Sequence, residues 1–82
     1  MISCSNYDYI EIVCLYRYPV RLQLQSGEVF EGTALDTARN QERQECIKIQ
    51  VNESKQLVQL DTIVNLEVTV ENPHIKGKVS IS

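Results

Sequence analysis

A pair of alternating segments joined by a short turn constrains the fold of this chain most strongly. In residues 19–25, apolar side chains alternate with arginine and glutamine, which is the period of a strand with one buried face. Ser26-Gly27 then offers a two-residue turn, and the alternation resumes over residues 28–37. These segments predict an antiparallel hairpin. Gly32 inside the second strand predicts a bend or bulge, as in a small sheet that curls into a barrel.

Shorter alternating segments follow at spacings of about ten residues. They predict strands over residues 45–51, 56–60 and 62–71, with a short strand over 78–81. The polar stretch 38–45 predicts a loop. Five to six antiparallel strands in 82 residues indicate a mostly β chain, forming one small barrel or sandwich as a single domain, residues 1–82. The expected core is Leu22, Leu24, Phe30, Ile47, Ile49, Leu60, Ile63 and Val68.

The segment before the hairpin, residues 5–17 (SNYDYIEIVCLYR), follows another period. A strand would place one acid on each face, with Asp8 on one side and Glu11 on the other. A helical period instead separates an apolar stripe from a stripe that holds both acids. The mainly apolar stripe is Ile10, Val13, Cys14 and Arg17, with Tyr7 at its edge, and the acidic stripe is Asp8, Glu11 and Leu15. Helical spacing therefore accounts better for this segment.

The ends of this helix have their own signals. Ser5 to Asp8 resembles a capping box in which aspartate replaces the usual glutamate, and an acid near a helix N-terminus is favoured by the helix dipole. The β-branched residues oppose a helix, each by a few tenths of a kcal/mol. Pro19 requires the helix to end before it. We expect one helix over about residues 6–17.

Charge and motif content argue against several function classes. The formal net charge of −3 and the pI of about 5.0 oppose nucleic-acid binding, which needs clustered Lys and Arg, and fit a basic partner. No nucleotide-binding glycine motif or nucleophile motif is present. The single histidine, His74, lacks the spacing of a zinc ligand and is expected to be an exposed loop residue. We expect no enzyme activity, no metal and no cofactor.

Cysteine usage and hydropathy indicate the compartment. Three cysteines without a CxxC pair favour reduced thiols over a disulfide-stapled scaffold. The chain shows no signal peptide, and no apolar run approaches the roughly 20 residues that cross a bilayer. We therefore expect a cytoplasmic protein that does not bind membranes.

The predicted order of one helix and about five short strands is similar to that of the Sm-like small barrel. The stretch LVQLDTIVNLEV, residues 57–68, looks like the fourth and fifth strands of that fold. Many Sm-like proteins bind RNA through loop patterns that the corresponding loops here, ALDTARNQER and TVENPHIKG, do not carry. An Sm-like RNA-binding module that assembles as a ring is therefore an alternative function, and an adaptor for an unrelated partner is another.

The whole chain also resembles the Rho-binding antiterminator family (Rof-like proteins). The resemblance runs through ISCSNYDYIEIVC, LQLQSGEVFEG, LVQLDTIVNLEV and the closing KVSIS. Its most specific part is a cysteine, two small polar residues, Tyr-Asp-x-Ile-Glu and a second cysteine ten positions after the first. This resemblance implies a non-catalytic, cofactor-free Sm-like barrel with an N-terminal helix. It also implies binding to the N-terminal, OB-type RNA-binding domain of the termination factor Rho. This binding would block RNA loading and lower Rho-dependent termination.

The resemblance also suggests which residues bind the partner. The family pattern covers Tyr7, Asp8 and Glu11, and Tyr9 is added from its side-chain chemistry alone. The acids are expected to pair with Lys or Arg of Rho, and a tyrosine to supply a rigid anchor. Asp36 and Arg39 flank the polar loop and are expected to form a second contact. We expect the free protein to be a monomer that binds no nucleic acid directly.

Overall fold

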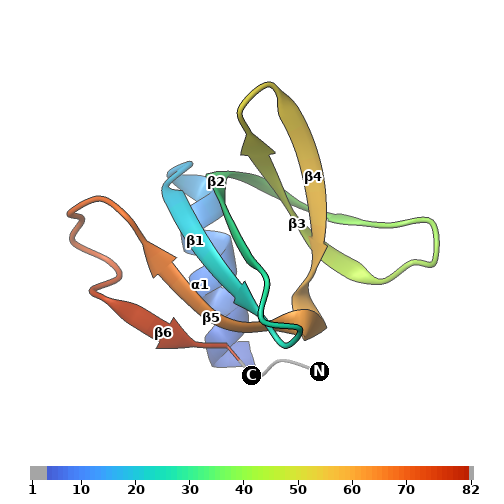
Figure 1. Ribbon diagram of the computed structural model, residues 1–82. Coiled ribbons are helices and arrows are strands. Elements are labelled where there is room, and N and C mark those ends of the chain that lie inside the picture. The colour runs from blue at the N-terminus through green and yellow to red at the C-terminus, as the bar shows by residue number, and fades with distance from the viewer. Residues whose placement is uncertain (1–3, 82) are drawn as a thin grey trace.

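Six antiparallel strands form one strongly curved sheet in the computed structural model, which describes residues 4–81 (Figure 1). The order of strands across the sheet is β4-β3-β2-β1-β5-β6, and the helix α1 precedes all of them. The bounds are α1 Cys4–Leu15, β1 Pro19–Leu24, β2 Val29–Arg39, β3 Glu45–Val51, β4 Ser54–Gln59, β5 Ile63–Val68 and β6 Lys78–Ser80. The expected mostly β fold with one N-terminal helix is confirmed.

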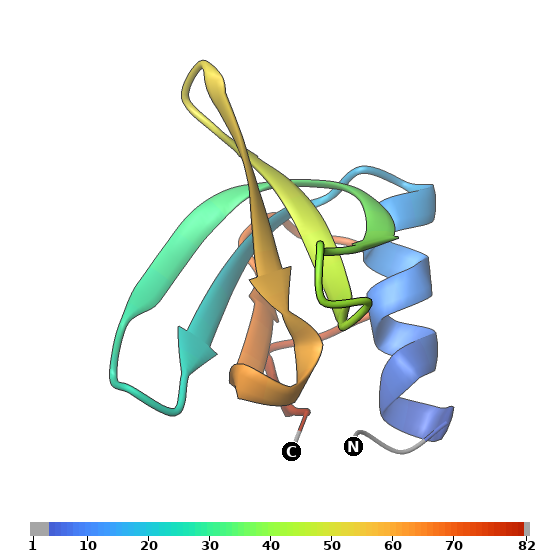
Figure 2. The same cartoon turned by 90° about the vertical axis from the view of Figure 1, so that its right-hand side faces the viewer.

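The long strand β2 curves because two features bend it. An added Cβ at Gly32 would lie 2.5 Å from the carbonyl oxygen of Gln50, so only glycine allows β3 to approach this closely. The register of the β2–β3 pair then shifts between Ala34 and Asp36, which marks a bulge. The bend predicted at Gly32 is thus a close backbone approach, and the bulge follows it at Leu35. Figure 2 shows β2 arching across the molecule toward α1, with the β3–β4 hairpin rising above it.

One hydrophobic core joins α1 to the strands of the sheet. Ile10 and Val13 contribute from α1 and are fully buried. Most of the expected core residues are buried, but Leu24 and Phe30 are only partly buried, close to the β1–β2 turn. Ile75 and Ile81, which follow β5, are buried as well, and alternation alone did not predict them.

The helix begins and ends about two residues earlier than expected, at Cys4 and Leu15. Ser5 therefore lies inside the helix rather than at its N-cap position, and the Ser5 side chain that the predicted capping box needs lies outside the described part of the chain. At the other end, the N–H of Tyr18 donates to the carbonyl of Val13 (3.0 Å) and the N–H of Arg17 to that of Cys14 (3.2 Å). These bonds form a Schellman motif, with Arg17 in the left-handed conformation (φ 52°). The helix is ended by this motif before the chain reaches Pro19.

Several strand ends also differ from the expected bounds. The first strand ends at Leu24 instead of residue 25. The strand β2 continues into the expected loop 38–45, whereas β3 covers residues 45–51 as predicted, so residues 40–44 remain as the turn. This turn is ordered by the Oδ1 of Asn40, which accepts hydrogen bonds from the N–H groups of Glu42 and Gln44, both at 3.0 Å.

The later strands are shifted in the same way. β4 starts at Ser54, two residues earlier than expected, and β5 ends at Val68 rather than at residue 71. The predicted break between these strands is a single 3-10 turn, Leu60–Thr62, in which the Thr62 hydroxyl donates to the carbonyl of Gln59 (2.6 Å). β6 covers only Lys78–Ser80.

Candidate protein-binding site

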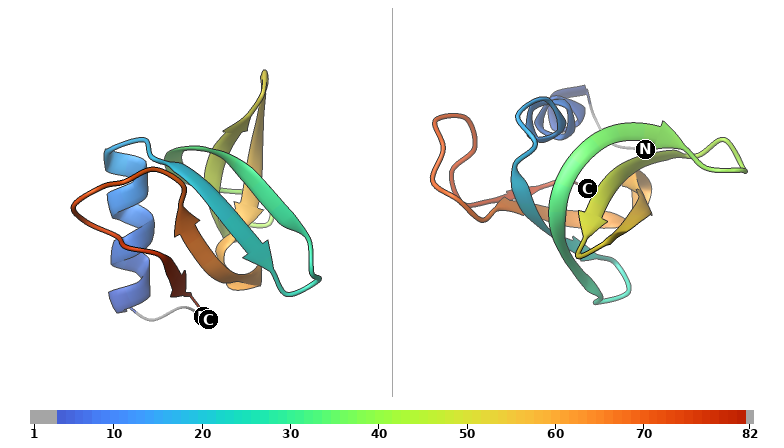
Figure 3. Two further views of the ribbon diagram at one scale, coloured as in Figure 1. Left: turned by 60° about the vertical axis from the view of Figure 1, so that its left-hand side comes forward. Right: turned by 90° about the horizontal axis from the view of Figure 1, so that it is seen from above.

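An open groove of about 640 Å³ lies between α1 and the second half of β2. These two elements are in contact, and Figures 2 and 3 show β2 crossing close to α1. The groove is lined by Tyr7, Asp8, Glu11, Ile12, Cys14, Leu15, Leu35, Asp36 and Thr37. Its lining combines apolar side chains with three carboxylates and contains no Lys or Arg.

The three carboxylates come from two elements that are distant in sequence. Asp8 and Glu11 are exposed and lie about one turn apart on α1. Asp36 is exposed on β2, where its Oδ1 accepts a hydrogen bond from the N–H of Thr37 (2.8 Å). Lys48 on β3 lies opposite Asp36 in the strand register and outside the groove lining. The groove therefore presents negative charge to a partner.

The wall of the groove between α1 and β2 includes the half-buried thiol of Cys14. Burial and, to a smaller extent, the negative charge of Asp36 together raise the pKa of this thiol to about 11. At neutral pH the thiol is therefore protonated and neutral, so it behaves as an apolar part of the wall. Cys14 is therefore only partly buried, although the sequence predicted it on the buried stripe. Its raised pKa also reflects the negative charge of Asp36.

Two tyrosines that the sequence suggested as anchors occupy different positions. Tyr7 lines the groove and is half-buried. Tyr9 is also half-buried and packs against the hydrophobic core, and it is not part of the groove lining. The structure therefore brings Tyr7 together with the three acids but places Tyr9 on another side of the helix.

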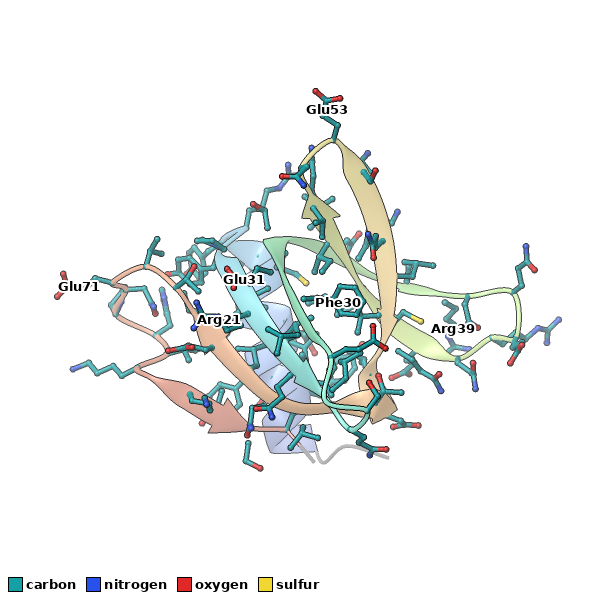
Figure 4. The ribbon with its side chains drawn as sticks, in the orientation of Figure 1. Arg21, Phe30, Glu31, Arg39, Glu53 and Glu71 are labelled. Atoms are coloured by element: carbon teal, nitrogen blue, oxygen red, sulfur yellow. The ribbon has the colours of Figure 1, made fainter. Side chains whose placement is uncertain are left out.

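Arg39 lies apart from this group. Its side chain is exposed near the end of β2, where it forms a long ion pair of 3.9 Å with Glu45. Figure 4 shows it toward the end of the β2–β3 hairpin, away from α1. Sequence proximity to Asp36 suggested a joint contact, but the strand carries the arginine away from the groove. A role for Arg39 in binding stays a prediction.

A second charged cluster lies on the outer face of the sheet. Arg21 on β1 binds Glu31 on β2 (3.2 Å) and Glu67 on β5 (3.0 Å), and Figure 4 shows the first of these pairs. The two carboxylates raise the pKa of the guanidinium, with the hydrogen bond to Glu31 as the largest cause. Because each charge already has a partner within the sheet, this cluster offers less to a ligand than the groove.

An aromatic cluster at the end of α1 was missed by sequence reasoning. The Tyr16 ring stacks on His74 with centroids 4.4 Å apart, and the Tyr18 hydroxyl forms a 2.7 Å hydrogen bond with Nδ1 of His74. His74 is exposed, as expected, but it is held by both tyrosines. The contact joins residues more than fifty positions apart, and no local pattern signals it.

Two further features, a metal site and a membrane-spanning helix, are absent from the described part of the chain. Residues 4–81 contain no group of three or more His, Cys, Asp or Glu side chains placed to hold a metal ion. Within the same residues, no helix is both long and apolar enough to cross a membrane.

Comparison with known proteins identifies similar chains. A family model described as "Modulator of Rho-dependent transcription termination (ROF)" matches residues 1–81. The solved structure of YaeO bound to magnesium, from Vibrio cholerae O395, is 41% identical, with a TM-score of 0.87. The match covers 93% of the present chain and 97% of the YaeO chain. No curated protein matches significantly.

Proposed function

Because this chain belongs to the ROF family of modulators of Rho-dependent transcription termination, we propose that it binds Rho and inhibits termination. The proposed target is the N-terminal, OB-type domain that forms the primary RNA-binding site of Rho. Occupying that site blocks RNA loading. The protein acts in the cytoplasm as a monomer, by binding alone, without catalysis or a cofactor.

The observation that carries this proposal is the acidic groove between α1 and β2. A site for single-stranded RNA combines a basic groove with surfaces on which bases stack. The groove described above offers the complementary features: three carboxylates and a tyrosine on a partly apolar wall. Asp8, Glu11 and Asp36 can take the positions of RNA phosphates, and Tyr7 can supply a rigid aromatic contact.

The energetics favour a contact at the centre of the interface. A salt bridge between exposed groups contributes only about 0–1 kcal/mol. The carboxylates contribute more where the partner covers them and excludes water, which the apolar wall of the groove assists. Their charge also speeds association, since opposite surface potentials steer the two proteins together. We propose that Tyr9 and Arg39, which lie outside the groove, make peripheral contacts.

Charge reversal on the helix tests this function. We expect the double variant Asp8→Lys/Glu11→Lys to lose most of its binding to purified Rho and to stop promoting readthrough of a Rho-dependent terminator. The matched control is Glu28→Lys/Glu42→Lys, which changes the net charge equally on two exposed acids outside the groove. The control should bind like the unmodified protein.

Two results would contradict the proposal. One is normal Rho binding by a folded Asp8→Lys/Glu11→Lys variant. The other is a ring-sized oligomer in size-exclusion chromatography together with a gel shift of RNA in the absence of Rho, which would favour the Sm-like RNA-binding alternative.

A further inference from the structure

The outer face of α1 carries an apolar stripe beside the acidic one. Asp8, Glu11 and Leu15 are spaced i, i+3, i+7, and Tyr9, Ile12 and Tyr16 repeat this spacing one position later. The N–H of Tyr16 donates to the carbonyl of Ile12 (3.1 Å), so helical geometry continues as far as Tyr16. The two stripes therefore run in parallel along the helix.

This apolar stripe becomes more exposed toward the end of the helix. Tyr9 and Ile12 are half-buried against the core. By contrast, 50% of Tyr16 and 73% of the adjacent Leu15 are exposed. Leu15 also lines the acidic groove, so the apolar surface is continuous with it. The remaining strongly exposed large apolar residues among those described lie on other elements, which is ordinary for a soluble protein.

The Tyr16 ring is fixed in the free protein. It stacks on His74 with an interplanar angle of 23° and on Tyr18 at a centroid distance of 5.5 Å. The loop that carries His74 is itself ordered, because Oδ1 of Asn72 accepts hydrogen bonds from the N–H groups of His74 (2.9 Å) and Ile75 (2.7 Å). Ile75 anchors that loop in the core. An exposed ring that is already ordered loses little entropy on binding.

We propose that Tyr16 and Leu15 form an apolar contact that extends the Rho-binding surface beyond the acidic groove, with Tyr18 and His74 as positioning residues. This inference rests on the proposed function. The occupant is an apolar or aromatic side chain of the RNA-binding face of Rho, next to its cationic groups. Such faces carry side chains on which RNA bases stack, and the exposed ring of Tyr16 can stack on a side chain of that kind.

The charge at this end of the helix supports an apolar contact over an ionic one. Arg17, which directly follows Tyr16, is exposed and would be repelled by a basic face. The acids Asp8 and Glu11 lie nearer the start of the helix, where they line the groove together with Asp36. Tyrosine is also among the residues most often found at energetic hot spots of interfaces.

Substitution of Tyr16 tests the contact directly. We expect Tyr16→Ala to weaken binding to purified Rho about tenfold or more, as for a hot-spot tyrosine. The slope of affinity against salt concentration should not change, since no charge is removed. Tyr16→Phe should bind within about twofold of the unmodified protein, because it keeps the ring. Val29→Ser, at an exposed valine on the β1–β2 hairpin, is the control and should have no effect.

The positioning role has a separate readout. Tyr18→Phe removes the hydroxyl that binds His74, and His74→Ala removes the stacked ring. Each should weaken binding about two- to fivefold, and neither should weaken it further when Tyr16 is already alanine. A purely structural role would instead reduce binding in both backgrounds.

Three outcomes decide the inference. Leu15→Ser should also weaken binding several-fold. Because the Leu15 side chain is largely exposed, this substitution should leave folding intact. This variant decides the question if Tyr16→Ala does not fold. If folded Tyr16 and Leu15 variants bind normally while Asp8→Lys/Glu11→Lys does not, the inference is wrong and the proposed function stands. If the unmodified protein does not bind Rho, both are wrong.

Discussion

The Cys14 thiol and the Asp36 carboxylate act on each other across the groove. Burial is the main cause of the raised pKa of Cys14, about 11, and the charge of Asp36 adds to it. A group whose pKa is higher in the folded state stabilises the fold below its ordinary pKa, here 9.0. That contribution is lost as the pH rises from about 9 to about 11.

We expect Asp36→Asn to lower the pKa of Cys14, because it removes the negative charge while it keeps a similar shape. The measurement is the rate of alkylation of the Cys14 peptide against pH, followed by mass spectrometry. The Asp36→Asn profile should shift to lower pH but stay above that of an unfolded peptide, since burial remains. Glu42→Gln, which removes an acid in the β2–β3 turn, should leave the profile in place. An unchanged profile in Asp36→Asn would contradict the proximity of these two groups.

Individual residues of the site differ in how well the sequence could predict them. Helical spacing placed Asp8 and Glu11 on one exposed stripe, and this is where the structure has them. The same spacing cannot tell which tyrosine is exposed, because that depends on what packs beside the helix. The ring of Tyr9 meets the core, whereas Tyr16 meets His74 from a distant loop.

The helix α1 shows why element ends are harder to predict than elements. Its apolar stripe predicts a helix, but its C-terminal end depends on a backbone motif that usually contains glycine. Here Arg17 takes the left-handed conformation, φ 52°, that costs a residue with a Cβ about 1–2 kcal/mol. The motif is formed by the backbone hydrogen bonds of Arg17 and Tyr18. Because arginine stands where glycine is usual, the sequence carries no signal for it.

We expect Arg17→Gly to stabilise the protein by up to about 1 kcal/mol, because glycine adopts this conformation without the steric cost. The greater freedom of glycine in the unfolded chain offsets part of the gain. Thermal unfolding measures the effect, which corresponds to a rise of roughly 4–8 °C per kcal/mol in a domain of this size. Arg17→Ala keeps the Cβ and removes the charge, so it should give little change. An equal gain in both variants would assign the effect to the charge instead.

At the scale of the whole molecule, alternation predicted the strands and their antiparallel hairpins, because each strand has one buried face. It could not predict that β2 would curve far enough to bring Asp36 against α1. That curvature arises from Gly32 and the bulge at Leu35, of which the sequence indicated only the glycine. The groove is thus a product of the tertiary fold, although two of its three acids lie in one recognisable stretch of sequence.

The charge of the whole molecule makes a prediction about kinetics. The protein has a net charge of −3, and its proposed binding surface gathers three acids that face a basic partner. Attraction over such distances speeds the encounter of the two proteins and is screened beyond about 8–10 Å at physiological ionic strength. We therefore expect the association rate constant with Rho to fall severalfold between about 50 and 500 mM salt, as for an electrostatically steered encounter. The dissociation rate constant should change much less.

Surface plasmon resonance at several salt concentrations separates these two rates. In Asp8→Asn/Glu11→Gln, which keeps the shape of both side chains, association should be slower and its salt dependence weaker. Tyr16→Ala should show the opposite pattern, with normal association and faster dissociation, because the contact of an apolar ring forms only after docking. If salt changed dissociation and left association unaffected, the acids would not steer the encounter. Binding would then have to be explained by short-range contacts alone.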